Sequence, residues 1–134
     1  MNRKAKVCLH VPPGSAAAGR LKSALASLGP DYTWEVTETL AQLQDCLMRT
    51  SPRPSLAVLL VQDGEHLARL AGLASLWEDL RLIMVLPEFG PGTLKLAHRL
   101  GPRFITHMQS DFSDVREVVA KMAALSRAEL RQPA

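Results

Sequence analysis

At the centre of the sequence stands Leu56-Ala57-Val58-Leu59-Leu60-Val61, an uninterrupted apolar run that follows a breaker-rich segment at 51–54. A second run of this kind, Leu82-Ile83-Met84-Val85-Leu86, ends at Pro87. Strands of a parallel sheet are covered on both faces, so they read as continuous apolar runs, whereas half-exposed strands alternate apolar and polar residues. The two runs therefore predict two central strands of a parallel sheet.

Two strand–helix units precede these runs. The first strand, at 6–11, is stopped by Pro12-Pro13-Gly14, and Ser15 stands where it can cap the helix that follows. The second strand, at 32–37, alternates apolar and polar residues, which predicts one solvated face. The helix after it, at about 40–48, carries an apolar stripe made of Leu40, Leu43, Leu47 and Met48.

The C-terminal half continues the same pattern. A third helix is predicted over 64–77, and its inward residues are Leu67, Leu70, Ala74 and Trp77. A fourth helix begins near Pro91, a favoured first helical residue, and a fifth strand occupies 103–107. The last helix carries an apolar stripe made of Val115, Val118, Val119, Met122 and Leu125.

Five strand–helix units in strict alternation predict an α/β fold. Such a pattern gives one doubly wound, five-stranded parallel sheet with five helices on both faces and right-handed crossovers. We expect a single domain over 1–134, with its core at about 5–127 and short flexible ends.

The composition indicates a globular protein: of 134 residues, 47% are hydrophobic and 22% are charged. The net charge of +3 is mild and the basic residues are scattered, so nucleic-acid binding is not expected. No apolar run approaches the ~18 residues of a membrane span, and the run at 7–11 is too short for a signal peptide. We therefore expect a cytoplasmic protein without a membrane partner. Cys8 and Cys46 lie in apolar segments and are expected to be reduced and structural.

Two local stretches carry a resemblance to a known family. Arg81-Leu82-Ile83-Met84-Val85-Leu86 is similar to the fourth strand of bacterial response-regulator receiver domains. Ala97-His98-Arg99-Leu100-Gly101-Pro102-Arg103-Phe104-Ile105 resembles the family's entry into strand five, where small residues and a glycine precede an aromatic and an apolar residue. The order and lengths of the units resemble those of chemotaxis-regulator-like receivers along nearly the whole chain. The resemblance implies a flavodoxin-like sheet with strand order 2-1-3-4-5 and a place in two-component signal transduction.

The resemblance also assigns five functional positions, and all five are changed here. The acidic pair that holds magnesium falls on Val11 and Pro12, and the phosphoacceptor aspartate falls on Leu60. The hydroxyl residue falls on Leu86, and the lysine falls on His107, with Met108 replacing the usual proline. Magnesium needs oxygen ligands, and phosphoryl transfer needs the charge on the transferring group to be neutralised. The chain is therefore expected to be a degenerate pseudo-receiver, without enzymatic activity, cofactor or bound metal.

Asp63 is the one carboxylate near the missing phosphoacceptor, and it has two interpretations. It is either a displaced acceptor or the N-cap of the third helix, and without a metal pair opposite we favour the cap. The segment from Gly14 to Leu21 follows a strand and opens a helix, as a phosphate-binding loop does. However, Arg20 replaces the lysine and Leu21 replaces the hydroxyl residue of that motif, so nucleotide binding is not favoured.

The remaining polar candidates also have structural interpretations. His10 and His107 could both approach the carboxyl edge of the sheet, but two histidines make a poor metal site without a third ligand. His10 lies within a predicted buried strand, so we expect a hydrogen-bonded core imidazole. Asp111 and Asp114, three residues apart before the last helix, resemble a capping box.

We expect the chain to act as a phosphorylation-independent signalling and regulatory protein-interaction module. The resemblance implies a partner face formed by the fourth helix, fifth strand and fifth helix. Its residues are Lys95, His98, Arg99, Arg103, Met108, Arg116 and Lys121. This basic surface suits an acidic protein partner or a homodimer. Two alternatives stay open: a small-ligand or nucleotide sensor near Gly14, Asp63 and Glu88, or the N-terminal regulatory domain of a longer transcription regulator.

Overall fold

The structure contains one parallel sheet of five strands, in the predicted order. A computed structural model describes residues 5–49, 54–77 and 79–131. The strands are β1 (Ala5–His10), β2 (Tyr32–Thr37), β3 (Leu56–Leu60), β4 (Arg81–Leu86) and β5 (Phe104–His107). They are arranged β2-β1-β3-β4-β5, and every neighbouring pair is parallel. The two apolar runs thus form two of the three interior strands, β3 and β4, and each predicted strand boundary lies within one residue of the observed one.

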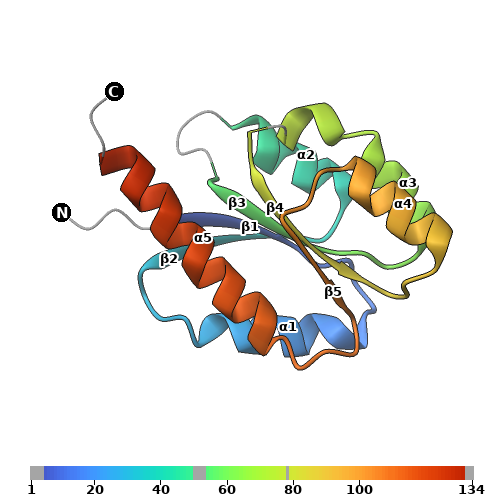
Figure 1. The fold of residues 1–134 in the computed structure, drawn as a ribbon, viewed down its shortest axis with the longest axis horizontal. Coiled ribbons are helices and arrows are strands. Elements are labelled where there is room, and N and C mark those ends of the chain that lie inside the picture. Colours follow the sequence, from blue (N-terminus) through green and yellow to red (C-terminus); the bar gives the residue numbers. More distant parts are fainter. Residues whose placement is uncertain (1–4, 50–53, 78, 132–134) are drawn as a thin grey trace.

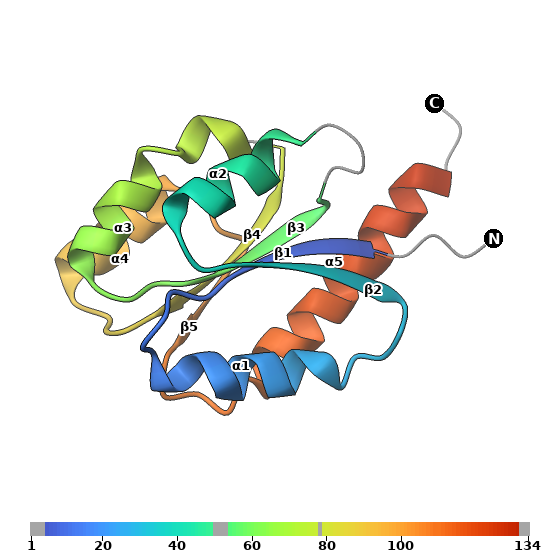
Figure 2. The ribbon, with the colours of Figure 1, turned by 180° about the vertical axis from the view of Figure 1, so that it is seen from behind.

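Helices cover both faces of this sheet (Figures 1 and 2). The α1 helix (Ala16–Ala26) and the α5 helix (Ser113–Arg131) lie on one face. The α2 helix (Leu40–Met48), the α3 helix (Gly64–Ala71) and the α4 helix (Pro91–Arg99) lie on the other. No helix among the described residues is long and apolar enough to cross a membrane.

The sheet divides the core into two layers. All five residues of β3 are completely buried, and successive side chains point into opposite layers. Full burial of one such side chain contributes about 1.5–3 kcal/mol, so this strand anchors both layers. The layer under α1 and α5 includes half-buried Trp34, which stacks on Tyr32 at 5.7 Å between ring centroids. The layer under α2, α3 and α4 contains buried Trp77.

The third predicted helix is interrupted, which corrects its expected span of 64–77. The α3 helix ends at Ala71, and a 3-10 turn called η1 (Ala74–Trp77) follows after Gly72. The Gly72 N–H bonds to the carbonyl groups of Arg69 and Leu70, which tightens the last turn. Glycine also favours the helix less than other residues by about 1 kcal/mol, so the helix ends there.

Three predicted inward positions are exposed instead. Met48 is 59% exposed at the end of α2, and Leu125 is 56% exposed on α5. Val36 is 45% exposed on the edge strand β2, although its alternation predicted a buried side chain. The polar face of β2 is the one that packs under α2, because Glu35 and Thr37 find polar partners there.

The α5 helix runs past residue 127, where we expected the core to end. It continues to Arg131, while the ends predicted to be flexible, 1–4 and 132–134, lie outside the described residues. At its start, Asp111 accepts from the backbone N–H of Ser113, and Asp114 bonds to Thr106 and Ser110. The predicted capping box between Asp111 and Asp114 is therefore wrong, because each carboxylate serves a different partner.

Candidate functional site

The carboxyl ends of four neighbouring strands meet at one edge of the sheet. In register, His10 lies opposite Leu59, Leu60 opposite Val85, and Leu86 opposite His107. Open α/β folds bind ligands outside this edge, in the loops that connect each strand to the next helix. The candidate residues of the sequence converge here, which makes this edge the candidate site.

The positions that the receiver resemblance assigns to phosphoryl chemistry are mostly apolar and buried. Leu60 and Leu86 are completely buried, and Val11 is 2% exposed. Pro12 is also buried. None of these four side chains carries an oxygen that could hold magnesium or accept a phosphoryl group. Across residues 5–49, 54–77 and 79–131, no group of three or more His, Cys, Asp or Glu side chains is placed to hold a metal ion.

His107, at the fifth position, is half-buried at the end of β5. Its ring lies edge-on to Phe89, with 5.2 Å between the ring centroids. Its Nδ1 accepts a hydrogen bond of 2.9 Å from the backbone N–H of Gln109. His107 therefore holds the start of the loop after β5 and does not approach His10.

Carboxylates of the chain itself serve the loops and helix starts at this edge. Asp63 caps α3 as predicted, since its Oδ1 accepts from the His66 N–H at 2.8 Å. Glu88 accepts from the Thr93 hydroxyl and from the Gly90 N–H at the start of α4, and these bonds hold its pKa below the usual range. Asp111 accepts from Ser113 at the start of α5, which likewise lowers the pKa of Asp111. At the starts of α3, α4 and α5, the positions that favour an anion are thus already occupied by carboxylates of the chain.

The side chain of Arg20 is hydrogen-bonded to the loop between β5 and α5. Its guanidinium donates to the carbonyl groups of Ser110 at 2.8 Å and Met108 at 2.6 Å. The same group lies 5.0 Å from the centre of the Phe112 ring, a cation–π distance. Phe112 is completely buried and has a φ of 65°. Arg20 is the cation that a phosphate-binding loop at 14–21 would need. Because its guanidinium instead binds the loop between β5 and α5, the structure does not favour that interpretation.

His10 is a hydrogen-bonded core imidazole, as predicted. It is completely buried at the end of β1, and its Nδ1 lies 2.9 Å from the hydroxyl oxygen of Thr37 on β2. Its Nε2 lies 3.0 Å from the Nε2 of His66 on α3, and the two rings are 5.2 Å apart between centroids. Three elements are therefore joined through one buried ring.

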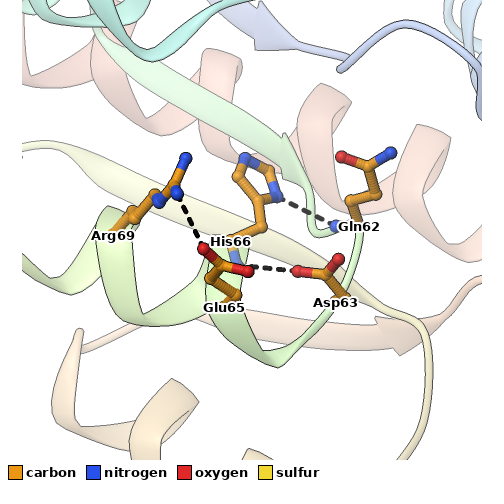
Figure 3. Close-up of a pocket in the computed structure, with 5 residues that line it drawn as sticks. All are labelled: Gln62, Asp63, Glu65, His66 and Arg69. Carbon is orange, nitrogen blue, oxygen red and sulfur yellow. Dashed lines mark hydrogen bonds and ion pairs between the residues drawn. The ribbon is translucent and has the colours of Figure 1, made fainter.

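His66 forms the outer half of this pair. Its Nδ1 accepts from the backbone N–H of Gln62 at 2.9 Å. Figure 3 shows its ring between Gln62 and the ion pair of Glu65 and Arg69, whose closest atoms are 2.7 Å apart. These residues, together with Asp63, line an open pocket of about 230 Å³.

Burial keeps both rings neutral. Desolvation, and then the charge of His66, lower the pKa of His10 to about 4. Burial also lowers the pKa of His66, with Arg69 acting in the same direction and Asp63 opposing it. Both imidazoles therefore carry a single proton at neutral pH.

A second polar cluster lies in the layer under α2. The thiol of Cys46 hydrogen-bonds to Cys8 and to Glu35, and together with burial these contacts raise the pKa of Cys46. The bond from Cys46 lowers the pKa of Glu35, as do the charges of Arg49 and Lys6 against the effect of burial. Both cysteines are free and buried. The raised pKa disfavours the reactive thiolate, so this cluster is structural.

The residues of the predicted partner face lie on either side of β5, an edge strand of the sheet (Figure 1). Lys95, His98 and Arg99 are exposed on α4, and Arg103 is exposed before β5. Arg116 and Lys121 are exposed on α5, and Met108 is half-buried after β5.

The sequence placed His10 and His107 at the same edge of the sheet, but the histidine that contacts His10 in the structure is His66. In the order β2-β1-β3-β4-β5, β1 lies beside β3, whereas two strands separate it from β5. Partners for His10 are therefore expected from β2 and β3 and from the segments that follow these strands. His66, in the first turn of the helix after β3, meets that condition and could have been found from the strand order.

The comparison with known proteins rests on structure alone. No protein-family model matches the sequence, and no curated protein matches it. A CheY-like response regulator protein from Mesorhizobium loti superposes with a TM-score of 0.71 and 21% identity, covering 90% of this chain and 99% of that one. The chain has the receiver fold.

Two further receiver structures support this assignment. A response regulator receiver domain (CheY-like) from Methanospirillum hungatei superposes with a TM-score of 0.71 and 16% identity, over 94% of this chain and 98% of its own. A response regulator from Burkholderia pseudomallei, solved with a phosphorylated aspartic acid, gives a TM-score of 0.66 and 16% identity. That match covers 98% of this chain and 76% of the other. At these identities the likeness establishes the receiver fold, with the predicted strand order.

Proposed function

We propose that this chain is a phosphorylation-independent signalling module that works through protein–protein contacts, as a single domain over 1–134 in the cytoplasm, and is not an enzyme. One observation carries the proposal: the strand ends at the carboxyl edge are apolar and buried, at Val11, Leu60 and Leu86. Phosphoryl transfer depends on positioned charge, and loss of a single donor from such a site costs on the order of 10²–10³ in rate. The receiver fold then remains as a scaffold for binding.

The experiment that tests this is an amide NMR spectrum recorded with Mg²⁺ and beryllofluoride, a mimic of the phosphoryl group on aspartate. The expected result is an unchanged spectrum, and an unchanged intact mass after incubation with acetyl phosphate. A receiver with an intact acceptor serves as the positive control. Shifts around Asp63 and Gly64, absent in an Asp63→Asn variant, would identify Asp63 as a displaced acceptor and overturn the proposal.

The proposed partner face is basic. Its charged side chains, Lys95, Arg99, Arg103, Arg116 and Lys121, are all exposed. Charges of one sign on a surface steer partners of the opposite sign, so an acidic protein is the expected partner and a homodimer is the alternative. Binding to polyglutamate as a probe should weaken with salt and with either single substitution, Arg99→Glu or Lys121→Glu. Substitution of exposed Lys22 on α1 by Glu makes the same change in net charge and is the matched control. Equal weakening by the control would remove this face from the proposal.

The small-ligand alternative has less support. Asp63 and Glu88 serve as local hydrogen-bond acceptors at α3 and α4, and Gly14 adopts a positive φ of 86° in a turn. The pocket beside His66 is smaller than the roughly 300–1,000 Å³ of typical ligand sites. A rise in melting temperature with added nucleotide would restore this alternative, because a ligand stabilises the state that it binds.

A further inference from the structure

The backbone of Gln62 fixes the position of the proton on His66. A backbone N–H can only donate a hydrogen bond, so the Nδ1 atom that faces it must be the unprotonated nitrogen of the His66 ring. A neutral imidazole carries one proton, which therefore resides on His66 Nε2. The tautomer of His66 follows from a single main-chain contact.

The same reasoning then fixes His10. The Nε2–H of His66 donates across 3.0 Å to the Nε2 of His10, which must accept. The proton of His10 is therefore on Nδ1 and is donated to the Thr37 hydroxyl oxygen at 2.9 Å. All four ring nitrogens have a partner, and the chain of bonds runs in one direction from the β3–α3 loop to β2.

Neither ring can take up a second proton without losing one of these hydrogen bonds. A proton on His10 Nε2 would set two N–H groups against each other across the ring–ring contact. A proton on His66 Nδ1 would face the Gln62 N–H in the same way. Either event replaces a hydrogen bond with two opposed donors, and the first does so against the completely buried ring of His10, where the lost bond leaves a polar group unsatisfied.

We propose that His10 and His66 form a proton-sensitive latch, the histidine latch, which holds the β3–α3 loop and the start of α3 against β1 and β2 and opens when the pair takes up a proton. His66 is the moving half, because it is half-buried and lines the open pocket, whereas His10 is enclosed. The inference stands whether or not the proposed partner face is correct.

Most of the charged side chains around the histidine latch have hydrogen-bond or ion-pair partners of their own. From α3, Asp63 caps the helix and Glu65 is paired with Arg69. From β2 and α2, Glu35 is paired with Lys6 and Arg49, while Asp45 and Arg49 line a second pocket beside Thr37. Among the described residues, the hydrogen bonds of the ring nitrogens run to each other, to Thr37 and to Gln62.

The histidine latch is expected to be closed at neutral pH and to open on acidification. The pKa values of both rings are lowered in the folded state, that of His10 to about 4. Opening returns the released ring toward an ordinary pKa of about 6.5. Each pH unit below that value therefore favours the open form about tenfold for each released ring.

The first test reads the ring protons directly by ¹⁵N NMR of the imidazoles at neutral pH. We expect His10 to be protonated on Nδ1 and His66 on Nε2. Protonation of His66 on Nδ1, or a doubly protonated ring at neutral pH, would overturn the proposal. The measurement uses the wild-type chain, so it does not depend on any variant folding.

The second test measures hydrogen exchange of the Gln62 amide, which donates directly to the histidine latch. Its protection factor should fall at least tenfold more than that of Val85 in the interior strand β4 when the pH is lowered from 7 to 4.5. The same fall is expected in a His98→Gln control, because His98 is exposed on α4. In a His66→Asn variant the protection should be low at both pH values. Equal changes at Gln62 and Val85 would indicate global unfolding and refute a local latch.

Discussion

At the scale of single residues, His10 makes the stability of the molecule depend on pH. Its pKa is lowered to about 4 by burial, whereas an exposed histidine titrates near 6.5. Between these values the unfolded chain binds a proton that the folded chain excludes. The stabilising difference is therefore complete above about pH 6.5 and is lost as the pH falls toward 4.

Each unit by which a pKa falls on folding is worth about 1.4 kcal/mol. We therefore predict that His10 alone lowers the free energy of unfolding by about 3 kcal/mol between pH 7 and pH 4. Urea denaturation at a series of pH values measures this change. Repeating the series in high salt shows how much of the change comes from the exposed carboxylates instead. A free energy of unfolding that stays constant between pH 6.5 and 5 would contradict the prediction.

Thr37 supplies the acceptor for the buried Nδ1–H of His10, and it is itself 2% exposed. Replacement by valine keeps the shape of the side chain but leaves that donor unsatisfied. We predict that Thr37→Val lowers the free energy of unfolding by about 1–3 kcal/mol. Thr33 is exposed on the same strand, so Thr33→Val should change it by less than about 0.5 kcal/mol. Chemical denaturation of the two variants compares them, and equal effects would show that the hydroxyl has no special role.

At the scale of elements, Arg20 connects α1 to the loop between β5 and α5. Its two hydrogen bonds to main-chain carbonyl groups order the segment in which Phe112 holds a φ of 65°. A non-glycine residue in this region carries backbone strain, and packing of the buried ring offsets it. The contact lies at the surface, so its contribution to stability is small even though it orders a loop.

We predict that Arg20→Gln lowers the free energy of unfolding by about 1 kcal/mol and increases amide exchange at Met108 to Ser110. Lys22→Gln, two residues further along α1 and also exposed, should leave both quantities unchanged. Hydrogen exchange followed by mass spectrometry distinguishes the two variants. If both variants exchange alike at this loop, Arg20 does not hold it.

Local sequence signals predict the helices and strands. The burial predictions that are wrong concern residues at the end of an element or on an edge strand. The apolar runs of β3 and β4 and the breakers between units predicted each strand to within a residue. Met48, Leu125 and Val36 fit the apolar spacing of their helix or strand, yet their side chains are exposed because no neighbouring layer covers them. Periodicity shows which face of an element is apolar, but it does not show where the neighbouring layer ends.

The polar contacts of the candidate site were less predictable. Strand order was implied by the resemblance, and it places β1 beside β3, yet nothing local to His66 marks it as a partner for His10. The hydrogen bonds from Arg20 join residues about 90 positions apart in the sequence, and no sequence motif predicts them. Side-chain contacts between distant segments depend on rotamers and loop paths, which a single sequence does not encode in any regular spacing.

At the scale of the whole molecule, the loss of phosphoryl chemistry that we propose involves several positions along the carboxyl edge, so we expect that no single substitution restores it. Leu60 is completely buried, so Leu60→Asp would place an unpaired charge in the core. We predict that this variant loses more than about 3 kcal/mol of stability and gains no mass with acetyl phosphate. Gln62→Asp, exposed in the adjoining loop, should retain its stability and also remain unmodified. Phosphorylation of Leu60→Asp would show that the lost metal ligands are dispensable.

The two core layers give the molecule a built-in optical probe of folding. Of its two tryptophans, Trp34 is half-buried on the side of α1 and α5, and Trp77 is buried on the side of α2, α3 and α4. In a Trp34→Phe variant, fluorescence would report only the Trp77 layer, while circular dichroism reports all helices. Coincident transitions by the two signals would mean that the layers unfold together through the shared sheet, whereas separate midpoints would reveal a partly folded state with one layer intact.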